Sequence, residues 1–235
     1  MKNGNVFINV ITVFAVLLIF APAIFFIVFD PGGGAFHPVL ILTPIGFLVL
    51  TFFNYRHRRA ELTTEISSAV SAFGNIVPPA GEKDSAPTVR FERNGSVFAV
   101  QVFETKYNVT YTAVFRIQRE DEKFLIQDDA YFSSKGNFSD CRPVDFPGLT
   151  RNPLLYSSYP QFLLYLLNKE SIRREIEKYP VATFWTQSHL SISFENSLFV
   201  LEWKADSRDQ QEKLRMVCET AVVFQEEIKN YAEIR

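Results

Sequence analysis

The chain has 235 residues, of which 47% are apolar, and a formal net charge of −2 at neutral pH. Once Lys2 and Asp30 are set aside, 23 Lys and Arg face 25 Asp and Glu, so there is no surplus of positive charge to bind nucleic acid. The two cysteines are far apart in sequence, which excludes the disulfide framework of a small secreted domain and favours a reducing compartment.

Two apolar runs near the N-terminus are typical of membrane spans. Residues 6–29 carry no charge, and a helix needs about 20 such residues to cross the hydrocarbon layer of a bilayer. Residues 36–55 form the second run, and a short link with three consecutive glycines joins the two. The pattern predicts a two-helix transmembrane hairpin over residues 1–55. A cleaved signal peptide is the alternative for the first run, because Ala21 and Ala23 give it a small-x-small cleavage pattern.

A cluster of arginines follows the second run. Arg56, Arg58 and Arg59 are expected to lie at the membrane surface, where they would retain that end in the cytoplasm. Lys2 precedes the first run, and the link carries neither Lys nor Arg. Both termini are therefore predicted to be cytoplasmic in an integral protein of the inner (plasma) membrane. Three glycosylation sequons would gain meaning only in the opposite orientation; they begin at Asn94, Asn108 and Asn137.

A basic and amphipathic segment over 56–76 is expected to be helical from Ala60, because its apolar residues recur at helical spacing. Residues 77–87 are rich in proline and polar side chains, and they are predicted to be a linker. Alternating apolar residues then predict an antiparallel meander of about four strands over 88–127, with its first hairpin turn at Asn94-Gly95.

The remainder alternates between helix and strand. Residues 161–179 are predicted to be helical with a break near Asn168. Three strands follow, at 181–187, 189–195 and 197–204, and the short breaks between them at Gln187-Ser188 and Asn196-Ser197 predict hairpin turns. A helix over 208–231 closes the chain with Cys218 on its buried face. We therefore predict a membrane-anchored α+β protein whose soluble domain, 88–235, is antiparallel sheet covered by helices. Division of this domain into two α/β halves, 88–153 and 154–235, is the alternative.

No catalytic template fits the sequence. There is no glycine-rich phosphate loop, no nucleophile elbow, and no pair of histidines at ligand spacing, so we assign no catalytic, cofactor-binding or metal-binding residue. The segment 128–153 lacks periodicity, and a loop held by a rigid sheet is where sites often form. Its charged residues are candidates for a ligand loop or, alternatively, turn formers and solvated charges: Asp128, Asp129, Asp140, Arg142 and Asp145.

These observations favour a membrane-tethered cytoplasmic interaction or assembly module. Its expected partners are the lipid bilayer and either another protein or a second copy of the chain, with no nucleic acid. Two alternatives remain open. One is a membrane-anchored ligand-sensing or regulatory domain with a pocket near the 128–153 loop. The other is an enzyme with an unrecognised site.

Overall fold

The computed structural model describes residues 36–77, 87–105, 108–119, 122–128, 138–150, 153–181 and 188–234, with side chains described between residues 45 and 231. Residue contacts divide the chain into two compact units, Met1–Ala60 and Glu61–Arg235. The second unit contains all the described strands and is an α+β fold.

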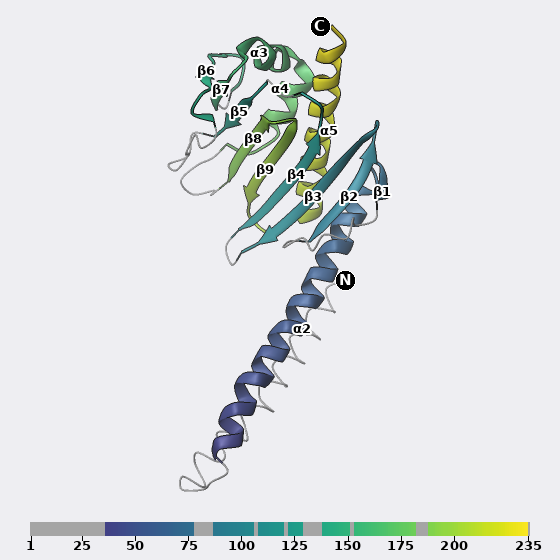
Figure 1. Ribbon diagram of the computed structural model, residues 1–235, viewed down its shortest axis with the longest axis vertical. Coiled ribbons are helices and arrows are strands. Elements are labelled where there is room, and N and C mark those ends of the chain that lie inside the picture. The colour runs from purple at the N-terminus through teal and green to yellow at the C-terminus, as the bar shows by residue number, and fades with distance from the viewer. Residues whose placement is uncertain are drawn as a thin grey trace. The chain divides into compact units, whose positions relative to one another are not determined.

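One antiparallel sheet of nine strands forms the centre of the second unit, in the order β1-β2-β3-β4-β9-β8-β5-β7-β6 (Figure 1). The strands are β1 (Asn75–Val77), β2 (Thr88–Arg93), β3 (Ser96–Glu104), β4 (Val109–Arg116), β5 (Phe124–Gln127), β6 (Arg142–Pro143), β7 (Leu154–Ser157), β8 (His189–Glu195) and β9 (Leu198–Ala205). Strands from both predicted groups, before and after residue 153, therefore hydrogen-bond into the same sheet.

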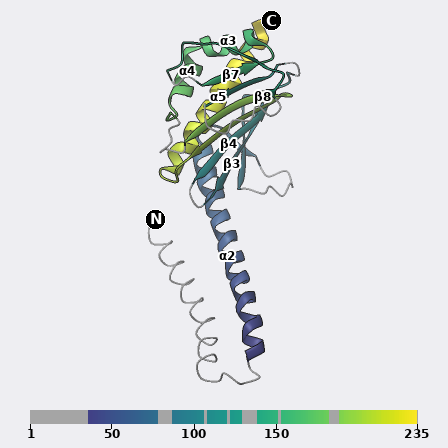
Figure 2. The same cartoon turned by 90° about the vertical axis from the view of Figure 1, so that its left-hand side faces the viewer.

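Three helices follow the predicted positions closely. The helix expected over 161–179 is two helices, α3 (Pro160–Asn168) and α4 (Glu170–Glu177), which confirms the break near Asn168. The closing helix is α5 (Gln210–Ile234), and it packs against β4, β9, α3 and α4. Figure 2 shows α4 and α5 together beside the sheet. The predicted covering of antiparallel sheet by helices is thus present.

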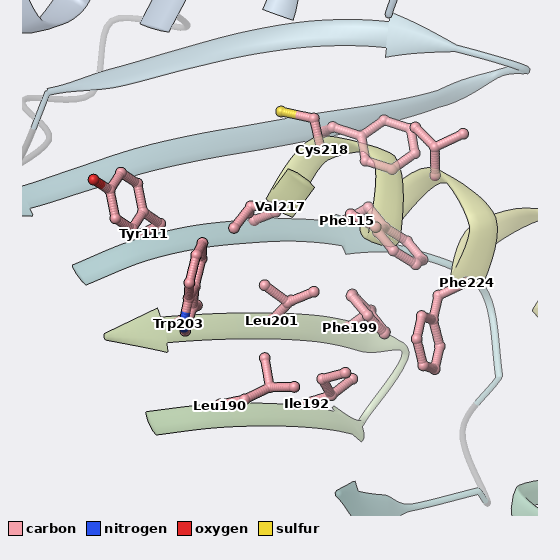
Figure 3. Packing of buried hydrophobic residues seen from close by; sticks show 14 of the residues in the cluster. Tyr111, Phe115, Leu190, Ile192, Phe199, Leu201, Trp203, Val217, Cys218 and Phe224 are labelled. Carbon is pink, nitrogen blue, oxygen red and sulfur yellow. The ribbon is translucent and has the colours of Figure 1, made fainter. Parts of the chain in front are cut away.

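The core lies between α5 and the middle of the sheet. Alternate residues of β4, β8 and β9 point toward α5, among them Phe115, Ile192 and Trp203 (Figure 3). From the helix, Phe224 points back toward β9, and both Phe224 and Cys218 of this helix are fully buried. Stacking of Phe115 on Phe199, with ring centroids 4.4 Å apart, extends this packing across β4 and β9. The sheet face away from α5 carries the other residue of each alternating pair.

Two tight hairpin turns connect neighbouring strands. Asn94 and Gly95 both have positive φ between β2 and β3, and Asn196 and Ser197 do so between β8 and β9. Two consecutive residues with positive φ give the backbone twist that suits a two-residue hairpin. The predicted turns at Asn94-Gly95 and Asn196-Ser197 are confirmed.

The predicted four-strand meander is wrong at its last strand. β2, β3 and β4 pair in sequence order, but β5 pairs with β7 and β8 instead of β4. The β8–β9 hairpin lies between β4 and β5, because β9 pairs with β4 along its whole length. The chain leaving β4 crosses the turn of this hairpin, where Ile117 N donates to Ser197 O at 2.9 Å. Periodicity identifies strands but does not specify these long-range pairings.

The helix predicted over 60–76 differs at both ends. It is the last part of α2 (Phe36–Val70), and the chain after it pairs as β1 with β2. Gly74 explains the change, because a Cβ atom placed there would lie 2.2 Å from the carbonyl oxygen of Glu92. Only glycine permits this close approach of two backbones. The linker predicted over 77–87 lies, apart from its two end residues, outside the described residues.

The structure of α2 contradicts the predicted membrane anchor. Among the described residues, no helix is long and apolar enough to cross a membrane. This finding contradicts the membrane-anchored fold, the transmembrane hairpin and the location as an integral protein of the plasma membrane with cytoplasmic termini. The apolar run 36–55 does not end as a separate span, because the same helix continues through Arg56, Arg58 and Arg59 to Val70. The other predicted span, 6–29, lies outside the described residues.

Candidate functional site

A hollow of about 360 Å³ opens on the sheet face that points away from α5. Its floor consists of residues at the ends of β4, β8 and β9, where Arg116 pairs with Leu198 and Leu198 pairs with Glu195. Neighbouring strands lie about 4.8 Å apart, so Arg116 and Glu195 are separated by roughly 10 Å across the hollow. The complete lining is Arg116, Phe138, Ser193, Glu195, Asn196, Leu198 and Val200.

Phe138 forms the wall of the hollow and comes from the segment between β5 and β6. The turn that contains it is closed by a hydrogen bond from Cys141 N to Phe138 O at 3.1 Å. Lys123 ties this turn to the sheet, because its ammonium lies 3.4 Å from Asp140 and 3.2 Å from Glu195. Hydrogen bonding to Glu195, together with the nearby charge of Asp140, raises the pKa of Lys123 above its usual value. The lysine therefore stays charged and holds the two segments together.

Cys141 lies beside this ion-paired group but is not suited to nucleophilic chemistry. Its side chain is buried, and its sulfur lies 3.9 Å from Asp140 Oδ1. Burial raises the pKa of the Cys141 thiol, and the carboxylate of Asp140 raises it further. The thiol therefore remains protonated at neutral pH, whereas a reactive cysteine needs a lowered pKa.

Comparison of the chain with protein-family models, with curated proteins and with solved structures gave no match.

The hollow combines a cation with an apolar wall. The Arg116 side chain is exposed at the end of β4, and it forms no ion pair or hydrogen bond with the part of the chain that the structure describes. Glu195 is paired with Lys123, but Lys123 is shared with Asp140, so this group of one cation and two carboxylates carries a net charge of −1. Arg116 supplies the separate positive charge that lies next to Phe138, Leu198 and Val200. Such an arrangement can bind and orient an anion.

Of the four predicted ligand-loop residues that the structure describes, only Asp140 lies in the shell of the hollow, through its ion pair with Lys123. Asp128 is buried at the opposite end of β5, where its carboxylate accepts a hydrogen bond from Leu190 N at 2.8 Å. This contact extends the pairing of β5 with β8 and has a structural role. Arg142 and Asp145 are exposed on β6 and on the segment that follows it, whereas Asp129 lies outside the described residues.

The residues that form the hollow, other than Asp140 in its shell, were missed by the sequence analysis. Arg116 lies on β4, whereas Glu195 and Leu198 lie on the β8–β9 hairpin, which is far from β4 in sequence. The only signal was the alternation itself, which placed them on the solvent-facing side of their strands. Their proximity depends on the insertion of the β8–β9 hairpin beside β4, which no local pattern specifies.

The three arginines predicted to lie at a membrane surface are part of the continuous helix α2. Arg56 places its guanidinium carbon 5.7 Å from the centre of the Phe52 ring. Arg58 and Arg59 are half-buried. Within the described ranges, no three His, Cys, Asp or Glu side chains form a group that could hold a metal ion.

A second surface feature lies on α2 before these arginines. We call it the α2 apolar patch, and its members expose between 47% and 66% of their surface: Ile45, Phe47, Leu48, Val49, Phe52, Phe53 and Tyr55. Some of them line a shallow hollow of about 650 Å³ that contains almost no polar surface. Isolated apolar residues on a surface need no explanation, but a contiguous group of this size is typical of an interaction site.

Proposed function

We propose that this protein is an assembly module that self-associates through the α2 apolar patch. The observation that carries the proposal is the exposure of seven large apolar side chains within eleven residues of one helix, from Ile45 to Tyr55. Leaving this surface in water costs about 25 cal/mol for each Å² of apolar area, so its burial favours association. No catalytic or cofactor role is needed to explain the patch.

The spacing of the patch supports a helix as its partner. Ile45, Leu48, Phe52 and Tyr55 are separated by three, four and three residues, which is the spacing of the contact positions of a coiled coil. At 100° per residue, Val49 and Phe53 lie on the same half of the helix. A broad apolar face of this kind suits packing of one helix against another.

A second copy of the chain is the partner that this face fits best. The patch carries no charged side chain that would select an oppositely charged protein. In a symmetric dimer, each copy presents the same surface to the other, so an apolar face of this spacing is complementary to itself. The arginines that follow it, Arg56 and Arg58, would lie at the end of the shared interface and remain in water.

The test is the mass of the full-length chain in solution, measured by sedimentation velocity over a range of concentrations. We expect a dimer or larger assembly for the unmodified chain. Changing both Leu48→Gln and Phe52→Gln removes two contact positions and is expected to shift the chain to monomer. Because both side chains are exposed, the change should leave the circular dichroism spectrum intact.

Phe103→Gln is the matched control, because Phe103 on β3 is exposed to 58% and Phe52 to 56%. This substitution should leave the assembly unchanged. A monomeric unmodified chain would overturn the proposal, as would equal dissociation by Phe103→Gln. A further experiment adds phosphatidylcholine vesicles to the unmodified chain, to test whether the patch binds lipid in place of a second copy. If the assembly dissociates and monomeric chains bind to the vesicles, self-association is refuted.

A further inference from the structure

We propose that the hollow beside Phe138 binds an organic anion that carries a planar apolar group. The inference is independent of self-association, since the hollow belongs to the unit Glu61–Arg235 and the α2 apolar patch to the unit Met1–Ala60. A carboxylate or a phosphate would contact Arg116, and the apolar part of the ligand would lie against Phe138, Leu198 and Val200.

The charge of the ligand follows from the charges around the hollow. Glu195 could repel an anion, but its carboxylate is only 20% exposed and is paired with Lys123. Lys123 also contacts Asp140, so its one positive charge lies between two carboxylates and the group of three carries a net charge of −1. Arg116 lies two strands away from Glu195 and supplies the charge that faces the opening. A guanidinium binds carboxylates and phosphates through two parallel hydrogen bonds.

The apolar part of the ligand follows from the wall and the floor. Phe138 is half-buried and lines one side of the hollow, whereas Leu198 and Val200 of β9 line the floor. Ser193 and Asn196 provide hydroxyl and amide groups that can bond to polar atoms of the ligand. A volume of about 360 Å³ lies at the small end of the usual range for ligand sites, which suits one or two fused rings with an acidic group.

The test uses 2-naphthoate as the probe and isothermal titration calorimetry with the full-length chain. Its neutral counterpart, 2-naphthamide, has the same ring and nearly the same size, so the comparison isolates the charge. We expect 2-naphthoate to bind at one site. The Kd of 2-naphthamide should be at least about ten-fold higher, because a hydrogen bond to a charged group is lost. Titration with 2-naphthyl phosphate shows whether Arg116 prefers a phosphate or a carboxylate, because its Kd can be compared with that of 2-naphthoate.

Two variants locate the binding site. Arg116→Gln is expected to raise the Kd for 2-naphthoate about ten-fold while leaving the Kd for 2-naphthamide unchanged. Arg142→Gln is the matched control, because Arg142 is also an exposed strand arginine but does not line the hollow. Phe138→Leu keeps an apolar side chain without the ring, and it should weaken both probes to a similar extent.

Three results would overturn the proposal. The first is absence of saturable binding of both anions in the millimolar range. The second is equal affinity for 2-naphthoate and 2-naphthamide, which would mean that Arg116 does not select charge. The third is an equal loss of affinity in Arg116→Gln and Arg142→Gln, which would indicate general attraction to positive charge. Because Arg116 is exposed, we expect its substitution to leave the unfolding transition unchanged. The same measurement on each variant serves as the control for folding.

Discussion

At the residue scale, Cys218 shows how the core shields one side chain from solvent and from thiol reagents. It lies on α5 facing the sheet, with no exposed surface, and burial raises the pKa of its thiol to about 12 (Figure 3). The neighbouring charge of Glu219 acts in the same direction. Only the thiolate reacts with thiol reagents, so both burial and protonation should protect this residue.

We predict that Cys218 in the folded chain does not react with Ellman's reagent at pH 8, whereas both cysteines react in denaturant. Cys141→Ala leaves Cys218 as the only thiol and makes the measurement direct. Cys218→Ala serves as the counterpart and reports on Cys141, whose pKa is also raised by burial. Rapid labelling of native Cys141→Ala would contradict the packing of α5 on the sheet.

At the scale of elements, the turn between β8 and β9 forms hydrogen bonds to the segment that connects β4 to β5. Ser197 Oγ accepts a hydrogen bond from Arg119 N at 2.9 Å and donates one to Arg119 O at 3.0 Å. Ser197 also has a φ of 63°, which favours glycine over residues with a Cβ atom. One residue therefore combines a backbone strain with two bonds that fix the path from β4 to β5.

We predict that Ser197→Ala lowers the free energy of unfolding by about 1–2 kcal/mol, because both hydrogen bonds are lost while the strain at φ is unchanged. Ser197→Gly loses the same bonds but relieves the strain, so it should cost about 1 kcal/mol less than Ser197→Ala. Urea unfolding followed by circular dichroism measures both. Equal stabilities for the alanine and glycine variants would show that the backbone strain has no energetic weight.

At the scale of the whole molecule, the central strands come from the C-terminal part of the chain. β8 and β9 lie between β4 and β5, and α5 covers them, so the core is completed only by residues 188–234. Strands β2 to β5 alone would leave β4 and β5 without their partners on that side. Most of the buried aromatic packing around Phe199 and Phe224 would also be absent.

We predict that residues 61–187 do not fold as an independent domain, whereas residues 61–235, which form one compact unit, do. The measurement is the dispersion of amide signals in a ¹H–¹⁵N correlation spectrum, together with cooperativity of thermal unfolding. The longer fragment should show dispersed signals and one transition. A dispersed spectrum for 61–187 would mean that the first strands form a stable sheet without β8 and β9.

The sequence by itself determined most of the local structure of the described residues between 88 and 231, whereas the strand predicted at 181–187 lies, apart from Val181, outside them. Alternation located the strands around Asn94-Gly95 and Asn196-Ser197, and helical spacing located α3, α4 and α5. These features depend on side chains two to four residues apart, which a single sequence displays directly. The burial of Cys218 followed from the same spacing and is confirmed.

Only the tertiary structure decided the order of the strands, the end of α2 and the composition of the hollow. β5 lies beside β8 because of pairings between residues more than sixty positions apart, and Gly74 turns the chain into β1 because it contacts the backbone of β2. Arg116 and Phe138 line the same hollow because of these long-range strand pairings. The membrane prediction was wrong because it relied on the length of the charge-free runs and on the cations that flank them, whereas α2 continues through the arginines without a break and no described helix is long and apolar enough to cross a membrane.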